Sequence, residues 1–136
     1  MANKKLVKIL SLDGGGIRGV IMAMILTHIE RQTGKPVSES FDLIAGTSAG
    51  GLLALGLTSP DEKGKPKYSA EDVADMYEYI AKTVFTRSYW SKIPLIGNLF
   101  GNKYTPVGAE KLIRELCGNL TLKDALCEVL VTSFDI

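Results

Sequence analysis

The chain has 136 residues, of which 46% are hydrophobic and 23% charged, a composition typical of one globular domain. Its 16 basic and 15 acidic residues nearly cancel, so the charge balance gives no indication of a nucleic-acid partner. One histidine and two well-separated cysteines, Cys117 and Cys127, do not provide the usual zinc spacings. We therefore expect no metal or cofactor, and we expect both thiols to be buried.

The N-terminal segment lacks the apolar core of an export signal, because its apolar run is interrupted at Lys8. No segment reaches the ~20 consecutive apolar residues that a membrane-spanning helix needs. From these two features we expect a cytoplasmic protein.

Two strand–turn–helix units are predicted in the first half of the chain. Residues 6–13 (LVKILSLD) and 41–47 (FDLIAGT) are short apolar runs that end in glycine turns, as buried parallel strands do. Residues 17–34 carry apolar side chains at helical spacing and stop at Gly34. The small-residue segment SAGGLLALGLT, from residue 48, predicts the second helix.

Two helices and a strand are predicted in the second half. Ser69 and the aspartate three residues later form a capping pattern for an amphipathic helix over 70–85. A further helix is expected over 106–116, with Gly118 as its stop. Residues 128–136 (EVLVTSFDI) predict a third buried strand.

These elements predict an α/β fold. Strands joined by helical crossovers form a parallel sheet with right-handed connections, here expected to have helices on both faces in a three-layer α/β/α arrangement. Sheets of this kind usually have more than three strands, so the chain looks truncated after its third core strand. We expect residues 1–136 to be the N-terminal part of a single domain.

The apolar segment TRSYWSKIPLIGNLFGNKY, residues 86–104, has no clean period. One interpretation is a flap that contacts lipid through side chains between Trp90 and Phe100. The other, which we favour because most aromatic side chains are buried, is an irregular loop that packs on the core.

The first glycine turn matches the dinucleotide-binding pattern G-x-G-x-x-G through Gly14, Gly16 and Gly19. A nucleotide-binding fold also needs an acidic residue at the end of the second strand to hold a ribose hydroxyl. Asp42 instead opens that strand. Nucleotide binding is therefore the less favoured interpretation.

The second glycine turn is G-x-S-x-G, formed by Gly46, Thr47, Ser48, Ala49 and Gly50. This spacing is typical of a nucleophile elbow, in which a strained strand-to-helix turn exposes the serine hydroxyl and small neighbours avoid collision. The N-terminal amides of the following helix would face the developing negative charge. We therefore predict Ser48 as a nucleophile.

Both turns are expected at the carboxyl edge of the sheet, since parallel strands end there together. The amides of Gly14, Gly15 and Gly16 would then lie across from Ser48 and Ala49 and form an oxyanion hole. The alternative is that both turns were selected for tight packing alone.

The base that would take the proton of Ser48 is harder to assign. His28 lies nine residues beyond Gly19 in the predicted helix, which places it about 14 Å from the carboxyl edge. Asp13 and Asp135 lie at strand ends, and the expected role of Asp13 is to bond the amides of the first turn. None of the three satisfies every requirement.

The segments LSLDGGGIRG, FDLIAGTSAGG and VLVTSFDI resemble the first half of a patatin-like phospholipase domain. The resemblance implies lipid acyl hydrolysis by a Ser-Asp dyad, with Ser48 as nucleophile and Gly14, Gly15, Gly16 and Arg18 in the oxyanion turn. The base in that family is an aspartate in a later D-G-[GA] motif. This chain has no D-G-[GA] after Ser48.

The sequence therefore favours a lipid acyl hydrolase of the phospholipase A type, with weak or no activity in these 136 residues alone. A lipid substrate and transient contact with a membrane surface are the expected partners, no nucleic acid is expected, and the oligomeric state is open. The alternative is a non-catalytic fragment that docks on a partner chain through its unpaired sheet edge.

Overall fold

The computed structural model describes residues 6–84 and 113–132. The predicted segment from Trp90 to Phe100, most of the predicted helix 106–116 and the candidate base Asp135 lie outside these ranges.

The sheet has three parallel strands in the order β1-β2-β3. Its register places Leu10 beside Ile44, and Ile44 beside Val129. This arrangement confirms the predicted α/β fold with a parallel sheet. The strands are β1 (Ile9–Leu12), β2 (Leu43–Thr47) and β3 (Glu128–Thr132).

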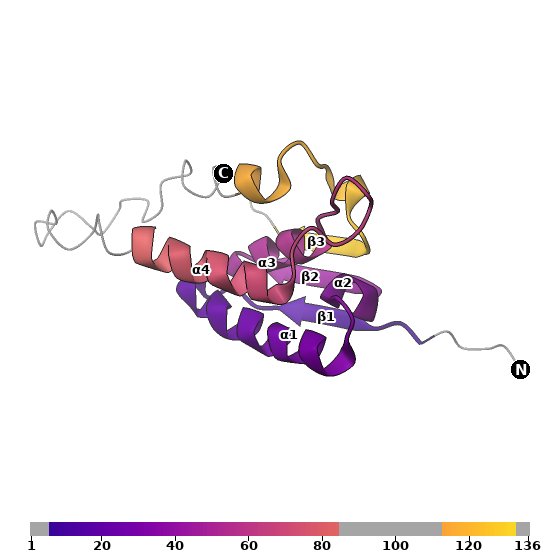
Figure 1. Ribbon diagram of the computed structural model, residues 1–136, viewed down its shortest axis with the longest axis horizontal. Coiled ribbons are helices and arrows are strands. Elements are labelled where there is room, and N and C mark those ends of the chain that lie inside the picture. The colour runs from indigo at the N-terminus through magenta and orange to yellow at the C-terminus, as the bar shows by residue number, and fades with distance from the viewer. Residues whose placement is uncertain (1–5, 85–112, 133–136) are drawn as a thin grey trace, which may run out of the picture.

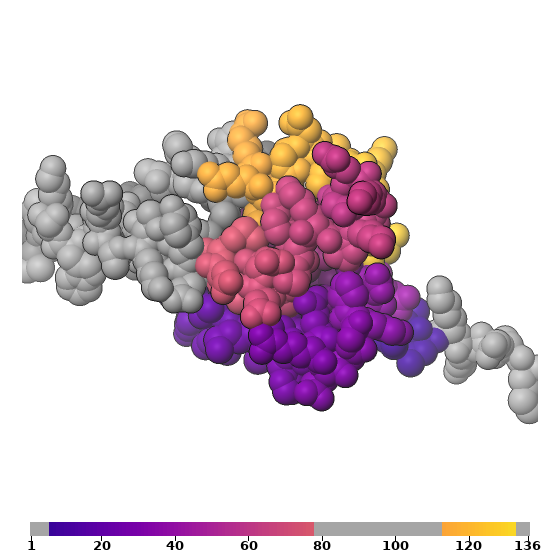
Figure 2. Space-filling view, in the orientation of Figure 1, coloured from indigo at the N-terminus to yellow at the C-terminus, as the bar shows by residue number. Residues whose placement is uncertain are grey.

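Helices connect the strands and pack together on the sheet. Helix α3 contacts all three strands and also touches α1 and α4, while α1 and α4 lie side by side (Figure 1). In the space-filling view the atoms of α4 lie directly against those of α1 (Figure 2). The helical elements are η1 (Gly16–Arg18), α1 (Gly19–Thr33), α2 (Val37–Ser40), α3 (Ala49–Thr58), α4 (Ala70–Val84), η3 (Leu122–Asp124) and a helical segment over 113–117.

The predicted helix boundaries are confirmed where the structure describes them. Gly34 ends α1 in the left-handed conformation (φ 64°), and its N–H donates to Glu30 O at 2.8 Å. Gly118 ends the helical segment 113–117 with φ 59°. At the start of α4, the Ser69 N–H donates to Asp72 Oδ2 at 2.8 Å and the Asp72 N–H donates back to Ser69 Oγ at 3.1 Å.

Among the described residues, the helices cover one face of the sheet. Leu12 and Ile44 point to that face and are buried, whereas Ile9 and Leu130 on the opposite face are 60% and 51% exposed. The strand order explains this: both crossovers move across the sheet in the same direction, so right-handed connections bring both helices to the same face. The second helical layer of the predicted three-layer arrangement is not among residues 6–84 and 113–132.

The core lies between this covered face and the helices. Helix α3 is apolar around most of its circumference because it contacts the sheet on one side and other helices on the other. Ile44 of β2, Leu53 and Leu57 of α3 and Val73 of α4 are each at most 2% exposed. The apolar faces of α3 and of the strands therefore hold the two glycine turns in fixed relation.

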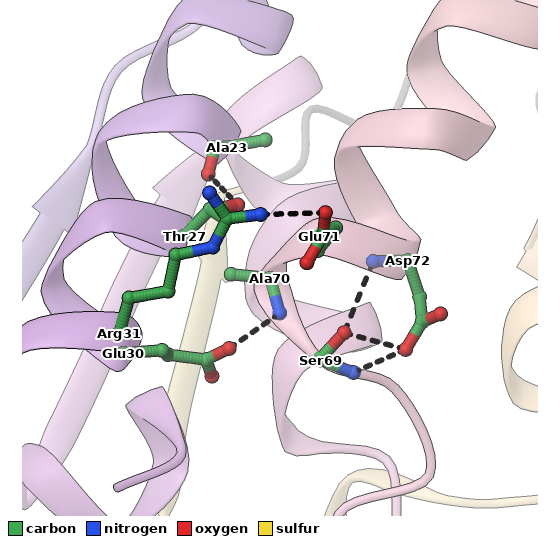
Figure 3. A network of polar contacts seen from close by, with 8 residues as sticks. All are labelled: Ala23, Thr27, Glu30, Arg31, Ser69, Ala70, Glu71 and Asp72. Atoms are coloured by element: carbon green, nitrogen blue, oxygen red, sulfur yellow. Dashed lines mark hydrogen bonds and ion pairs between the residues drawn. The ribbon is translucent and has the colours of Figure 1, made fainter. Parts of the chain in front are cut away.

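A polar network at the amino ends of the strands joins α1 to the starts of α4 and α2, and Figure 3 shows its contacts with α4. One carboxylate oxygen of Glu30 accepts the Ala70 N–H at the start of α4 at 2.8 Å. The other oxygen accepts the Val37 N–H of α2 at 2.9 Å. Arg31 of α1 adds an exposed ion pair with Glu71 at 2.7 Å. Glu30 thus caps two helix N-termini that are far apart in sequence.

Two expectations from composition concern the cysteines and the membrane. Cys117 and Cys127 are free cysteines, but each residue is partly exposed, so the expectation that both are buried is wrong. Within the described ranges, no helix combines the length and apolarity that a bilayer crossing requires.

Candidate active site

Ser48 stands at the junction between β2 and α3 with a strained backbone. Its φ is 54° and its ψ is −119°, and within the described ranges no other non-glycine residue has positive φ. Such a conformation costs about 1–3 kcal/mol and persists only where the surrounding packing enforces it. The side chain is exposed and does not cap α3. The serine hydroxyl is therefore presented at the surface at a point of enforced strain.

The glycines on either side of Ser48 are explained by backbone crowding. A Cβ atom on Gly46 would overlap the carbonyl of Gly50 in the first turn of α3. A Cβ atom on Gly50 would overlap the carbonyl oxygen of Leu12 in β1 and lie 2.9 Å from Asp13 O. The two glycines of G-x-S-x-G are thus required because the backbones of β2, α3 and β1 lie in close contact.

The first glycine turn lies directly against the serine. A Cβ atom on Gly14 would be 3.2 Å from Ser48 Cβ and 3.1 Å from Thr47 O, so a side chain here would force its neighbours to shift by a few tenths of an ångström. The expectation that both turns meet at the carboxyl edge of the sheet agrees with this contact. Two segments more than 30 residues apart therefore form one small surface around the hydroxyl.

The other residues of the first turn are less crowded than Gly14. Gly16 has φ 58°, which favours glycine, and has open space around its Cα. Gly15 lies near the side chain of Arg18, whose Cβ and Nε are 3.6 and 3.8 Å from a Cβ built on the glycine. Arg18 is exposed, and its N–H donates to Gly15 O at 3.2 Å. The guanidinium of Arg18 thus borders the turn from the solvent side.

The start of α3 is apolar and has no acidic residue in its first turn. Ala49, the first residue of this helix, is 5% exposed. The first amides of any α-helix have no acceptor within the helix, so they are available to an anion or oxyanion. On the other side of Ser48, the hydroxyl of Thr132 in β3 donates to the hydroxyl of Thr47 at 3.1 Å.

Tyr77 of α4 also reaches this region, although the sequence analysis did not single it out. Its hydroxyl donates a hydrogen bond to the carbonyl oxygen of Ala49. Burial raises the pKa of Tyr77 to about 12, so the phenol stays protonated and remains a donor near neutral pH. The helical pattern of residues 70–85 identifies Tyr77 as a core residue, but its contact with α3 depends on how two helices pack.

Among the described residues, neither His28 nor Asp13 forms a hydrogen bond with Ser48, and Asp135 lies outside them. His28 is exposed in the second half of α1, away from the glycine turns at the start of that helix. Asp13 is exposed. Within the described ranges its carboxylate forms none of the expected hydrogen bonds with the amides of the first turn.

The geometry disfavours the nucleotide-binding interpretation. Asp42 lies at the start of β2, where its carboxylate accepts the Lys8 N–H at 2.8 Å, so it is at the opposite end of the strand from the glycine turns. In the part of the chain that the structure describes, no three His, Cys, Asp or Glu side chains are grouped as metal ligands. The surface around Ser48 is instead built from backbone amides and small residues.

Replacing Ser48 by glycine is expected to stabilise the fold by about 1 kcal/mol, because relief of backbone strain exceeds the entropic cost of glycine. No side-chain cap is lost, since the hydroxyl makes none. Urea unfolding of both proteins measures the difference. Ser11→Gly in β1 is the control, because this exposed serine has ordinary strand geometry and its replacement should reduce stability. A Ser48→Gly protein less stable than the wild type would contradict the inferred strain.

Comparison with known proteins places the chain in a family. The family model for patatin-like phospholipases matches residues 10–132. Patatin-like protein 2 from Oryza sativa subsp. japonica is 37% identical over 97% of this chain and 35% of its own length. Patatin-like protein 4 from Arabidopsis thaliana is 36% identical over 96% of this chain and 34% of its own, and Patatin-T5 from Solanum tuberosum is 36% identical over 97% and 34%. The chain spans about a third of the length of these curated relatives. The chain belongs to the patatin-like phospholipase family.

Proposed function

We propose that this chain is the nucleophile-bearing, N-terminal part of a single patatin-like domain that hydrolyses acyl esters of phospholipids or related lipids. Ser48 is the nucleophile of the proposed reaction, and Ala49 with the turn Gly14–Gly16 supplies the oxyanion hole. Arg18 borders that turn, and Gly46, Thr47 and Gly50 complete the nucleophile elbow. Family membership supports the reaction class.

The observation that carries the proposal is the strained backbone of Ser48, with φ 54° and ψ −119°. Its Cβ lies 3.2 Å from where a Cβ on Gly14 would be. Packing alone does not require a serine there, since a glycine would adopt the same backbone with less strain. A serine that is both strained and exposed is what a strand-to-helix nucleophile turn provides.

In the proposed reaction, Ser48 Oγ attacks the carbonyl carbon of the ester while its proton passes to a base. The carbonyl oxygen becomes an oxyanion, which accepts hydrogen bonds from backbone amides of Ala49 and of the glycine turn. Collapse of this intermediate breaks the ester bond and releases the alcohol with a proton. Water then hydrolyses the acyl-serine by the same route and releases the fatty acid.

The base in this proposal is an aspartate, as the family resemblance implies, and not His28. The 136 residues contain no D-G-[GA] after Ser48. Residues 6–84 and 113–132 accordingly provide the nucleophile and the oxyanion hole of the proposed mechanism, and the general base is not assigned among them.

Contact with a membrane surface belongs to the same proposal. Four apolar side chains follow the first glycine turn at helical spacing and are 43–63% exposed: Ile17, Ile21, Met24 and Ile25. An exposed apolar stripe that begins beside the nucleophile suits a protein whose substrate lies in a lipid layer. A cytoplasmic location is part of the same proposal.

A fluorophosphonate probe tests the proposal because it reacts with an activated serine in one step. Ser48 Oγ forms the bond to phosphorus, fluoride leaves, and the serine proton is lost. We expect mass spectrometry to find one probe molecule on Ser48, and none on that site in Ser48→Ala. Ser11→Ala, which removes an exposed serine on the uncovered face of β1, is expected to label like the wild type.

An unlabelled Ser48 in a chain whose circular-dichroism spectrum is folded would overturn the proposed hydrolase. That result would favour the alternative, a non-catalytic module that docks on another protein chain. The exposed Ile9 and Leu130 on the uncovered face of the sheet favour this second candidate, since apolar side chains on a sheet face are usually covered.

A further inference from the structure

Tyr77 connects α4 to the two helices that follow the glycine turns around Ser48. It belongs to α4, it is 8% exposed, and it contacts the start of α1 and the start of α3. Both of these helices begin directly after a glycine turn. A single side chain therefore touches the elements that follow the nucleophile and the proposed oxyanion turn.

The hydroxyl end of Tyr77 contacts α3. Its donation to Ala49 O holds the first residue of that helix, immediately after Ser48. This hydrogen bond is buried, so water cannot replace it while the protein stays folded. A buried bond at this position restricts how the first turn of α3 can move relative to α4.

The ring of Tyr77 contacts α1. A Cβ atom on Gly19 would lie 2.6 Å from Cε1 of the ring and 3.1 Å from Cζ, so Gly19 lacks a side chain where the ring sits. This contact explains the last glycine of the GGGIRG motif, which the dinucleotide-binding pattern would assign to helix–strand packing. In this fold it is the ring of a tyrosine from α4 that requires Gly19.

We propose that Tyr77 is a positioning residue for the oxyanion hole: its ring and hydroxyl fix the starts of α1 and α3 so that amides of both turns face the same oxyanion. This inference rests on the proposed hydrolase function of Ser48. Tyr77 acts through Ala49 and Gly19 and does not touch the substrate. A residue that only filled the core would need its ring alone, whereas this positioning role also needs the hydroxyl.

The variant Tyr77→Phe separates the two parts of this side chain, because it keeps the ring against Gly19 and removes the hydrogen bond to Ala49. We expect the maximal rate constant for fluorophosphonate labelling of Ser48 to fall about tenfold, with the half-saturating probe concentration unchanged. Such a split indicates loss of transition-state stabilisation and not of probe binding.

Tyr68→Phe is the matched control. Its hydroxyl donates to Glu115 O at 3.5 Å on the exposed side of the molecule, far in sequence from both glycine turns. Its labelling kinetics should equal those of the wild type. Equal maximal rate constants for Tyr77→Phe and Tyr68→Phe would overturn the role of the hydroxyl.

Amide hydrogen exchange tests the same role without any reaction at Ser48. The Leu52 N–H donates to Ser48 O at 3.1 Å in the first turn of α3. Its exchange should become at least about threefold faster in Tyr77→Phe, while that of Gly34 at the end of α1 stays constant. Unchanged exchange at Leu52 would overturn the positioning role. If Ser48 is unlabelled in the wild type, the proposed function fails, and exchange at Leu52 alone decides whether Tyr77 holds the turn.

Discussion

Gly50→Ala is expected to destabilise the protein by about 3 kcal/mol or more, since overpacking against a fixed backbone is among the most costly core changes. The new methyl group would overlap the carbonyl oxygen of Leu12, and the next nearest atoms are also backbone atoms, Leu12 C at 2.6 Å and Asp13 O at 2.9 Å. Backbone atoms in a sheet strand cannot rotate away as a side chain can. The start of α3 must then move off β1, and the contact between Gly14 and Ser48 is lost.

Urea unfolding measures the loss of stability, and fluorophosphonate labelling of Ser48 measures the loss of the site. Gly56→Ala is the control in the same helix, because its Cβ would lie 3.4 Å from Val73 Cγ2, an ordinary contact. Alanine is favoured over glycine by about 1 kcal/mol within a helix, so this variant should be neutral or stabilising. If the two alanine variants have similar stability, the crowding at Gly50 is not what fixes this junction.

The second prediction is that the 136-residue chain hydrolyses esters only weakly. A complete serine hydrolase unit loses about 10⁶-fold in kcat when its serine is removed, because nucleophile and base act together. This chain has no D-G-[GA] after Ser48, so we expect Ser48→Ala to reduce its turnover of a p-nitrophenyl ester by less than about tenfold. Covalent labelling of Ser48 is still expected, because each site needs to react only once and the proposed oxyanion hole would still lower the barrier.

A Ser48→Ala protein that loses more than about a thousandfold in turnover would contradict this expectation. The 136 residues would then contain their own base. Asp13→Asn and Asp135→Asn, each compared with the wild type over a pH profile, would identify it, because the variant lacking the base should lose the limb of the profile that reports its ionisation.

The strands and turns were predictable because their signals are local. The apolar runs 6–13 and 41–47 become β1 (Ile9–Leu12) and β2 (Leu43–Thr47), and each is followed by the glycine turn that ends it. Gly34 as a helix stop and Ser69 as a cap are likewise set by residues within one turn. The family resemblance, confirmed by the match over residues 10–132, rests on the same two turns.

Features that depend on tertiary contacts were not predicted. Helix α2 (Val37–Ser40) is too short to form by propensity, and its first N–H is held by Glu30 from α1. The hydroxyl bond of Tyr77 to Ala49 joins residues 28 positions apart. Strand order, which places both crossover helices on one face, is also a property of the assembled sheet. A single sequence carries no local signal for such long-range pairings.

The treatment of the helix N-termini differs between the two ends of the sheet. The start of α4 carries Glu71 and Asp72 in its first turn, a reciprocal Ser69–Asp72 cap and the Glu30 carboxylate on its amide. The start of α3 has no acidic residue in its first turn and no side-chain cap. A missing cap costs a helix about 1 kcal/mol. The two ends therefore differ electrically: at the start of α4 carboxylates already neutralise the partial positive charge of the amides, whereas at the start of α3 no carboxylate does so. The amides beside Ser48 can then attract negative charge that appears only during a reaction.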